Sequence, residues 1–126
     1  MGETYESAGV SIAAGEEAVE RIKASRKAIG DSNTMLVGRC EAYLWGVTDL
    51  KLVIDRLSAY ADAGADCLFA PGVVDEGVLA TLVETLRFPV NILATTGTPS
   101  IAALMLWNSW SFCSGVIRRN RSPGWR

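Results

Sequence analysis

The sequence predicts an α/β domain built around a parallel β-sheet. After a first helical segment, three short apolar segments alternate with segments that have the spacing of amphipathic helices. The predicted strands begin at Met35, Asp66 and Val90, and separations of 31 and 24 residues leave room for one crossover helix each. Strands that are apolar along their whole length are typical of parallel sheets with covered faces.

The first helix is expected at residues 15–29, where Val19, Ile22 and Ile29 fall on one helical face. The sequence Asp-Ser-Asn-Thr then breaks the helical pattern. The apolar residues that follow predict the first strand, at residues 35–40, which carries an arginine near its end.

The second helix has the clearest pattern in the chain. Thr48 or Asp49 is its expected N-cap, and Gly64 marks its end. Its apolar positions follow the spacing of one buried helical face: Leu50, Val53, Ile54, Leu57 and Ala61.

Two more strands and two more helices follow. The second strand is expected at residues 66–70, and Asp75 can cap a helix that runs to Leu86. The third strand is expected at residues 90–94. A last helix follows it, with Thr98 as N-cap and Pro99 at the first helical position.

Polar side chains stand near the ends of these predicted strands. Strand–helix units of this kind build either an open doubly wound sheet or a closed eight-stranded barrel, and both bind ligands at the carboxyl ends of their strands. Arg39 and Glu41 occupy that end of the first strand, and Asn91 lies in the third. These residues are candidates for ligand contacts. The alternative is that Arg39 is only a salt-bridged strand end.

Length, composition and charge limit the possible classes of protein. A chain of 126 residues with 49% hydrophobic residues is long enough for one domain with a core. The net charge of −2 gives no indication of a nucleic-acid or membrane partner. No segment approaches the roughly 18 to 20 apolar residues of a membrane span, and the first residues lack the order of a signal peptide. A cytoplasmic location is therefore expected.

The three cysteines are far apart, and the chain has no histidine. This pattern argues against a disulfide framework and against a zinc site. Cys40 and Cys67 are expected to be small buried residues of strands, because no histidine is available to activate a catalytic thiol.

The end of the chain differs in character from the rest. We expect the folded domain to cover residues 1–106 and residues 107–126 to form an atypical basic and aromatic tail, without acidic residues and without a helical or strand period. One interpretation is a tail that binds nucleic acid or a partner. The other is that the tail is not the fold's own ending, as after a frameshift or truncation.

Three segments in the predicted order resemble one enzyme superfamily. They are GRCEAYLWG at residues 38–46, DLKLVIDRLSAYADAGADCLFAPGVVD at residues 49–75 and FPVNILA at residues 88–94. Across residues 10–104 they resemble the isocitrate lyase and phosphoenolpyruvate mutase superfamily, in particular its phosphonomutase-like and methylisocitrate-lyase-like branch. The arginine strand of that branch typically reads Ala-Arg-Thr-Asp-Ala or Ala-Arg-Val-Glu-Ala.

The resemblance implies a partial (β/α)8 TIM barrel with about three strand–helix units. Members of the superfamily break or rearrange C–C or P–C bonds in small 2-oxo or hydroxy acids and use Mg²⁺. Arg39 matches the family arginine, whose planar fork suits a carboxylate or phosphonate. Glu41 matches the acidic position that orients its neighbours, and Asn91 lies on a strand that often contacts ligand. Glu3 would be the counterpart of a metal-site glutamate.

Other family features are not found in this sequence: the Asp-x-Asp metal pair, the early substrate-binding glycine strand and the catalytic loop with Lys-Gly or Cys-Gly. We therefore assign no catalytic residue and expect the chain to bind the implied Mg²⁺ poorly. One hypothesis is a lyase or mutase fragment that binds a small carboxylate or phosphonate but is inactive alone. The other is a non-catalytic half-barrel that pairs with a partner chain, either a second copy or the missing barrel half.

Overall fold

Three parallel strands form the centre of the fold. In this computed structural model, which describes residues 12–106, 111–113 and 116–118, they are β1 (Val37–Arg39), β2 (Cys67–Phe69) and β3 (Val90–Leu93). β1 pairs with β2 and β2 pairs with β3, both in parallel. The predicted strands and their common carboxyl edge are therefore confirmed.

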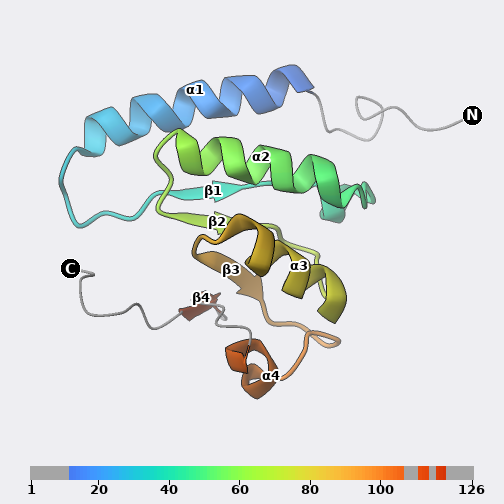
Figure 1. Cartoon of the computed structure of the whole chain (residues 1–126). Coiled ribbons are helices and arrows are strands. Elements are labelled where there is room, and N and C mark those ends of the chain that lie inside the picture. Colours follow the sequence, from blue (N-terminus) through green and yellow to red (C-terminus); the bar gives the residue numbers. More distant parts are fainter. Residues whose placement is uncertain (1–11, 107–110, 114–115, 119–126) are drawn as a thin grey trace, which may run out of the picture.

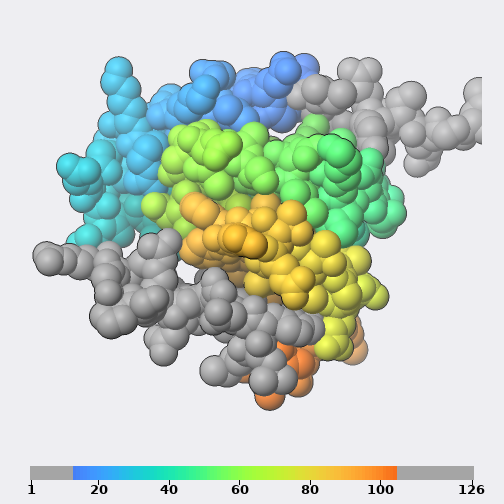
Figure 2. Space-filling model, in the orientation of Figure 1, coloured from blue at the N-terminus to red at the C-terminus, as the bar shows by residue number. Residues whose placement is uncertain are grey.

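Helices pack beside this sheet (Figure 1). The α-helices are α1 (Ile12–Ile29), α2 (Leu50–Asp62), α3 (Glu76–Leu86) and α4 (Ile101–Leu106), and a 3-10 helix, η1 (Ala42–Trp45), follows β1. α2 and α3 lie across one face of the sheet, and α1 lies alongside α2. In the space-filling view, these three helices form a continuous layer (Figure 2). α1 begins at Ile12, three residues earlier than predicted.

The core lies between the sheet and this helix layer. Leu68 and Ile92 of the strands and Leu57 and Leu82 of the helices are almost completely buried. Gly38 of β1 also faces the helices, because a Cβ atom there would lie 2.8 Å from the Cβ of Tyr60 in α2. The absence of a side chain at Gly38 therefore allows α2 to pack closely on β1.

Alternate strand residues point to the opposite face, where neither α2 nor α3 lies. Val37 and Leu93 are there, with 41% and 37% of their surface exposed. The sequence predicted covered faces on this sheet. Within the described part of the chain, α2 and α3 cover only one, and the other presents apolar side chains to solvent.

Several predicted helix ends agree with the structure. The Asp49 side chain accepts a hydrogen bond from the Leu52 N–H at 3.1 Å, so Asp49, not Thr48, is the N-cap of α2. Asp75 caps α3 in the same way, through the Val78 N–H at 2.9 Å. Gly64 follows α2 with a φ of +109°, a conformation that favours glycine.

The predicted start of the last helix is wrong. Ser100, not Thr98, caps α4, since its hydroxyl accepts a hydrogen bond from the Ala103 N–H at 3.2 Å. The Thr98 hydroxyl accepts from the Thr95 N–H at 2.9 Å and donates to the Leu93 carbonyl at 3.1 Å. Thr98 thus closes the turn after β3 and is not available as a cap.

Two further strands extend the sheet: β4 (Ser111–Cys113), parallel to β3, and β5 (Val116–Arg118), antiparallel to β4. They fall within the predicted tail, where the sequence showed no strand period. The rest of that tail lies outside the described residues, and the domain boundary at residue 106 stays a prediction. Among the helices that the structure describes, none is long and apolar enough to span a membrane.

Candidate functional site

Arg39 ends β1 at the carboxyl edge of the parallel sheet. Its side chain lies on the face opposite α2, because Gly38 beside it faces that helix. The Nε atom lies 2.6 Å from a carboxylate oxygen of Glu41, and both side chains are about half exposed, at 50% and 44%. Neither Nη atom has a partner within the described part of the chain.

Glu41 stands in the tight turn that follows the strand. Its carbonyl accepts a hydrogen bond from the Leu44 N–H at 3.0 Å, which opens η1, but its side chain makes no capping bond. The carboxylate is directed to Arg39 instead. Gly46, with a φ of +79°, ends this short helix. The prediction that Glu41 orients a neighbouring side chain agrees with this arrangement, although its role toward a ligand stays a prediction.

Phe69 supports the arginine from the neighbouring strand. It is the register partner of Arg39, and the guanidinium carbon lies 5.3 Å from the centre of its ring. A guanidinium over an aromatic face is attracted by the electron density of the ring. Two contacts from different elements, the ring and the Glu41 carboxylate, therefore hold Arg39 at the strand end.

Asn91 is the register partner of Phe69 on the next strand. Its side-chain oxygen lies 3.5 Å from the Cys67 sulfur, which donates this weak hydrogen bond. Arg39 and Asn91 are thus two strands apart on one face, roughly 10 Å between their Cα atoms at the usual strand spacing. The sheet brings together all three substrate-binding residues that the sequence predicted.

The cysteines behave as predicted where the structure describes their side chains. Cys40 and Cys67 are not part of a disulfide, and each is only 2% exposed. Burial is the main cause that raises the pKa of the Cys40 thiol above its ordinary value. Because only the thiolate is a strong nucleophile, Cys40 is poorly suited to covalent catalysis.

A magnesium ion needs several oxygen ligands, mostly carboxylates and water. Among residues 12–106, no three acidic, thiol or imidazole groups gather into a possible metal site. Glu41 is near Arg39 but is already paired with it. The residues that are described do not fit the implied ion, and Glu3 lies outside them.

Sequence reasoning missed Phe69 as part of this site. Its ring looked like an ordinary core residue of the second strand, and only the register places it opposite Arg39. The sequence signal that could have identified Phe69 is the alternation of strand side chains between the two faces of the sheet. Leu68 between Cys67 and Phe69 faces the helices, so its two neighbours must face the same side as Arg39.

Comparison with known proteins gives concordant matches. The family profile described as phosphoenolpyruvate phosphomutase matches residues 3–109. The 2-methylisocitrate lyase of Salmonella typhimurium is 33% identical over 91 residues, which cover 71% of this chain and 30% of that enzyme. The oxaloacetate decarboxylase of Pseudomonas putida is 35% identical over 86 residues, covering 68% of this chain and 28% of the enzyme.

Solved structures show the same relationship. A protein from Burkholderia cenocepacia J2315 with a tentative assignment as lyase/mutase superposes with a TM-score of 0.72 and 38% identity over 81% of this chain and 38% of that one. A 2,3-dimethylmalate lyase of the PEP mutase/isocitrate lyase superfamily gives 0.62 at 26% identity, over 75% of this chain and 35% of that one. This chain therefore spans about a third of the length of such relatives, and its fold is consistent with part of a (β/α)8 barrel.

Proposed function

Because the chain belongs to the phosphoenolpyruvate phosphomutase family, we propose that the carboxyl edge of its parallel sheet binds a small organic acid through Arg39. The observation that carries this proposal is which atoms of the Arg39 guanidinium have contacts and which do not. Glu41 and Phe69 fix its Nε side and its face, while both Nη atoms lack partners among the described residues. Two parallel N–H donors on a fixed plane suit a carboxylate or phosphonate group.

Asn91 is the proposed second contact. It lies on the same face as Arg39, with the Phe69 ring between them. A dicarboxylate or phosphonocarboxylate that lies over this ring can place one acidic group on Arg39 and a second polar group near the Asn91 amide. The amide offers both a donor and an acceptor, so it can bind a carboxylate or a hydroxyl oxygen.

The relatives named above are lyases and decarboxylases, and the family is described as a phosphomutase. We infer that this chain supplies the substrate-binding arginine of such chemistry. Arg39 would neutralise the acidic group next to the bond that breaks, and would orient it. We assign no bond-breaking step to this chain alone, because the described residues supply neither a metal site nor an activated nucleophile.

Oxalate titration followed by amide chemical shifts tests this proposal. We expect saturable shifts at residues 39–41 and 69, with a dissociation constant on the order of 1 mM, since one half-exposed charge contact dominates. Arg39→Ala should abolish these shifts, and Arg39→Lys should weaken binding. Arg21→Ala is the matched control, because it removes an exposed arginine that pairs with Glu17 on α1. Equal binding by Arg39→Ala and the unmodified chain would disprove the proposed site.

A second candidate function is assembly with a partner chain. One observation favours it: the sheet face opposite α2 and α3 exposes Val37 and Leu93, and β1 is an edge strand of the described sheet. Apolar faces and open strand edges of this kind attract other chains. We propose a second copy of this chain as the partner that covers this face.

Sedimentation velocity over a range of concentrations tests this assembly. A monomer–dimer equilibrium that Leu93→Glu shifts toward monomer supports the proposal. Ile101→Glu is the control, because it places the same charge at another exposed apolar residue, in α4. A monomer at every concentration would exclude assembly through the sheet face.

A further inference from the structure

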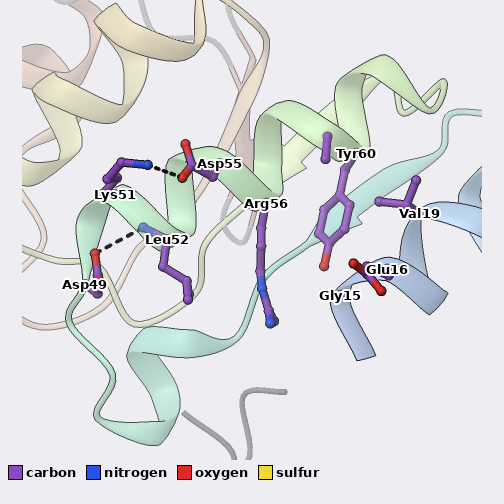
Figure 3. A pocket seen from close by; sticks show the side chains of 10 residues that line it. Gly15, Glu16, Val19, Asp49, Lys51, Leu52, Asp55, Arg56 and Tyr60 are labelled. Atoms are coloured by element: carbon purple, nitrogen blue, oxygen red, sulfur yellow. Dashed lines mark hydrogen bonds and ion pairs between the residues drawn. The ribbon is translucent and has the colours of Figure 1, made fainter. Parts of the chain in front are cut away.

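A cavity of about 400 Å³ lies between α1 and α2, on the helix side of the sheet (Figure 3). It is separate from the Arg39 site, because Arg39 lies on the opposite face of β1. Its volume is within the range of small-molecule sites. Part of its wall is apolar and comes from Val19 of α1 and from Leu52 and Ala59 of α2.

The Tyr60 hydroxyl is the unusual feature of this cavity. Tyr60 lines the cavity and is only 4% exposed, yet its hydroxyl has no hydrogen-bond partner in the part of the chain that the structure describes. Its ring projects from α2 toward α1, where Glu16 lies (Figure 3). Buried hydroxyl groups without a partner are rare and destabilising, so a bound molecule or water is expected beside it.

The charges around the cavity favour an anion next to Tyr60. Burial is the main cause that raises the pKa of the Tyr60 hydroxyl, and the positive charge of Arg56, which also lines the cavity, opposes this rise. Two of the three acidic groups in the wall are engaged elsewhere: Asp55 pairs with Lys51 at 2.5 Å, and Asp49 caps α2. Glu16 is the third and is exposed, so solvent screens its charge.

We propose that this cavity binds a small monocarboxylic acid with an apolar chain. Its carboxylate accepts a hydrogen bond from the Tyr60 hydroxyl and faces Arg56, and its apolar chain packs on Val19, Leu52 and Ala59. A guanidinium has five N–H donors, so Arg56 can contact a ligand and keep its other interactions. This second acid site does not depend on the function proposed for Arg39.

The probe for this site is 2-methylpropanoate, titrated into the full chain and followed by amide chemical shifts. We expect saturable shifts in α1 and α2, around residues 15–19 and 52–60, with a dissociation constant in the range of about 1 to 10 mM. Tyr60→Phe should weaken binding about fivefold to tenfold, because it removes one hydrogen bond to a charged group and keeps the ring. Glu16→Gln should change binding by less than about twofold, since solvent screens this exposed carboxylate.

Two controls separate this site from the other one. Arg39→Ala should leave the shifts that 2-methylpropanoate causes in α1 and α2 unchanged, and a cooperative urea transition should show that each variant folds. The neutral isostere 2-methylpropan-1-ol should bind more weakly than the acid. Absence of saturable shifts, meaning a cavity that holds water only, would overturn the proposal. The proposal would also be overturned if Tyr60→Phe bound 2-methylpropanoate as tightly as the unmodified chain does. Loss of the shifts in α1 and α2 in Arg39→Ala would overturn it as well.

Discussion

The Arg39 guanidinium lies over the Phe69 ring, with 5.3 Å between the guanidinium carbon and the ring centre. The two residues are register partners on neighbouring parallel strands, so the sheet itself sets their distance. Glu41 holds the same guanidinium from the following turn. A side chain that is half exposed is thus restricted from two directions, which reduces the entropy that a bound acid would have to remove.

Replacing Phe69 tests how much the stacking of its ring on Arg39 contributes to the affinity for oxalate. Phe69→Leu keeps an apolar side chain of similar size but removes the aromatic face. We expect oxalate binding about twofold to fivefold weaker, which corresponds to about 0.5 to 1 kcal/mol for an exposed cation–π contact. Leu93→Ala is the control, because it shortens an exposed apolar side chain on the same face of the sheet, at the end of β3. Unchanged affinity in Phe69→Leu would show that Glu41 alone positions the arginine.

Gly38 is predicted to be intolerant of a side chain. In Gly38→Ala the new Cβ would lie 2.8 Å from the Cβ of Tyr60, so α2 or β1 must shift. We expect a loss of about 1 to 3 kcal/mol in the free energy of unfolding, as for other overpacked core sites, measured by urea denaturation. Gly77→Ala in the exposed first turn of α3 is the control and should cost less than Gly38→Ala, because its Cβ would lie 3.3 Å from a side-chain oxygen of the exposed Asp75. Equal stability of both variants would contradict the close packing of α2 on β1.

Arg26 and Asp66 connect the end of α1 to the starts of two strands. Arg26 pairs with Asp66 and donates to the Gly64 carbonyl at 2.8 Å, and Asp66 also accepts from the Leu36 N–H at 2.8 Å. Both side chains are partly buried, at 27% and 33% exposed, so their interaction is less screened by water than that of a surface pair.

Asp66→Ala should therefore lower the free energy of unfolding by about 1 to 2 kcal/mol, because it leaves the Leu36 N–H without its acceptor. Asp66→Asn should cost less, since an amide oxygen can still accept that bond. Glu20→Ala breaks an exposed pair with Lys23 and should cost less than about 0.5 kcal/mol. Urea midpoints compare the three variants. A loss in Glu20→Ala as large as in Asp66→Ala would refute this ranking.

Periodicity and capping residues were sufficient to predict most of the fold. The spacing of Val53 and Leu57 placed them in the core, and Asp75 and Gly64 marked helix ends, because these signals are local. The predicted start of α4 was wrong because Thr98 and Ser100 stand two positions apart and a hydroxyl at either position could cap the helix. The turn closed by Thr98 decides between them, and that turn depends on where β3 ends.

The candidate site was predictable only in part. The positions of Arg39, Glu41 and Asn91 follow from the parallel topology, which places all strand ends at one edge. The partner of Arg39 depends on strand register, which a single sequence specifies weakly when the strands are short. β4 was missed for a related reason, since its residues follow no strand period and its place depends on pairing with β3.

Alkaline pH should destabilise the folded chain, because the buried thiol of Cys40 and the buried phenol of Tyr60 resist losing their protons. Burial raises the pKa of Cys40 above its value in the unfolded chain, about 8.5, and raises that of Tyr60 as well. Between the unfolded and the folded pKa, the unfolded state has already lost a proton that the folded state keeps. The contribution of Cys40 to stability is therefore constant below about pH 8 and falls as the pH rises from its unfolded toward its folded pKa. The contribution of Tyr60 falls in the same way above about pH 10.

Urea midpoints between pH 7 and about pH 11 measure this effect, since the unfolded phenol titrates near pH 10. Cys40→Ala should reduce the loss of stability that begins near pH 8.5, although the smaller side chain lowers stability at every pH. Tyr60→Phe should reduce the loss at higher pH. The same pH profile in Cys40→Ala as in the unmodified chain would show that Cys40 does not titrate in this window.

The last prediction concerns turnover. Chemistry that develops negative charge on an enolate oxygen needs electrostatic stabilisation there, and removal of one main element of such a site costs on the order of 3 kcal/mol, or about a hundredfold in rate. Among the described residues, Arg39 provides one cationic contact and no three ligands gather to hold a metal ion. We therefore expect the isolated chain, at millimolar Mg²⁺, to show no turnover of 2-methylisocitrate, phosphonopyruvate or oxaloacetate above the rate without protein. For oxaloacetate this baseline includes its spontaneous decarboxylation. Oxalate should still bind under the same conditions.

Turnover that EDTA abolishes would contradict this prediction. It would show that the chain does assemble a metal site, and Glu3 would then be the first residue to replace in a search for the metal ligands.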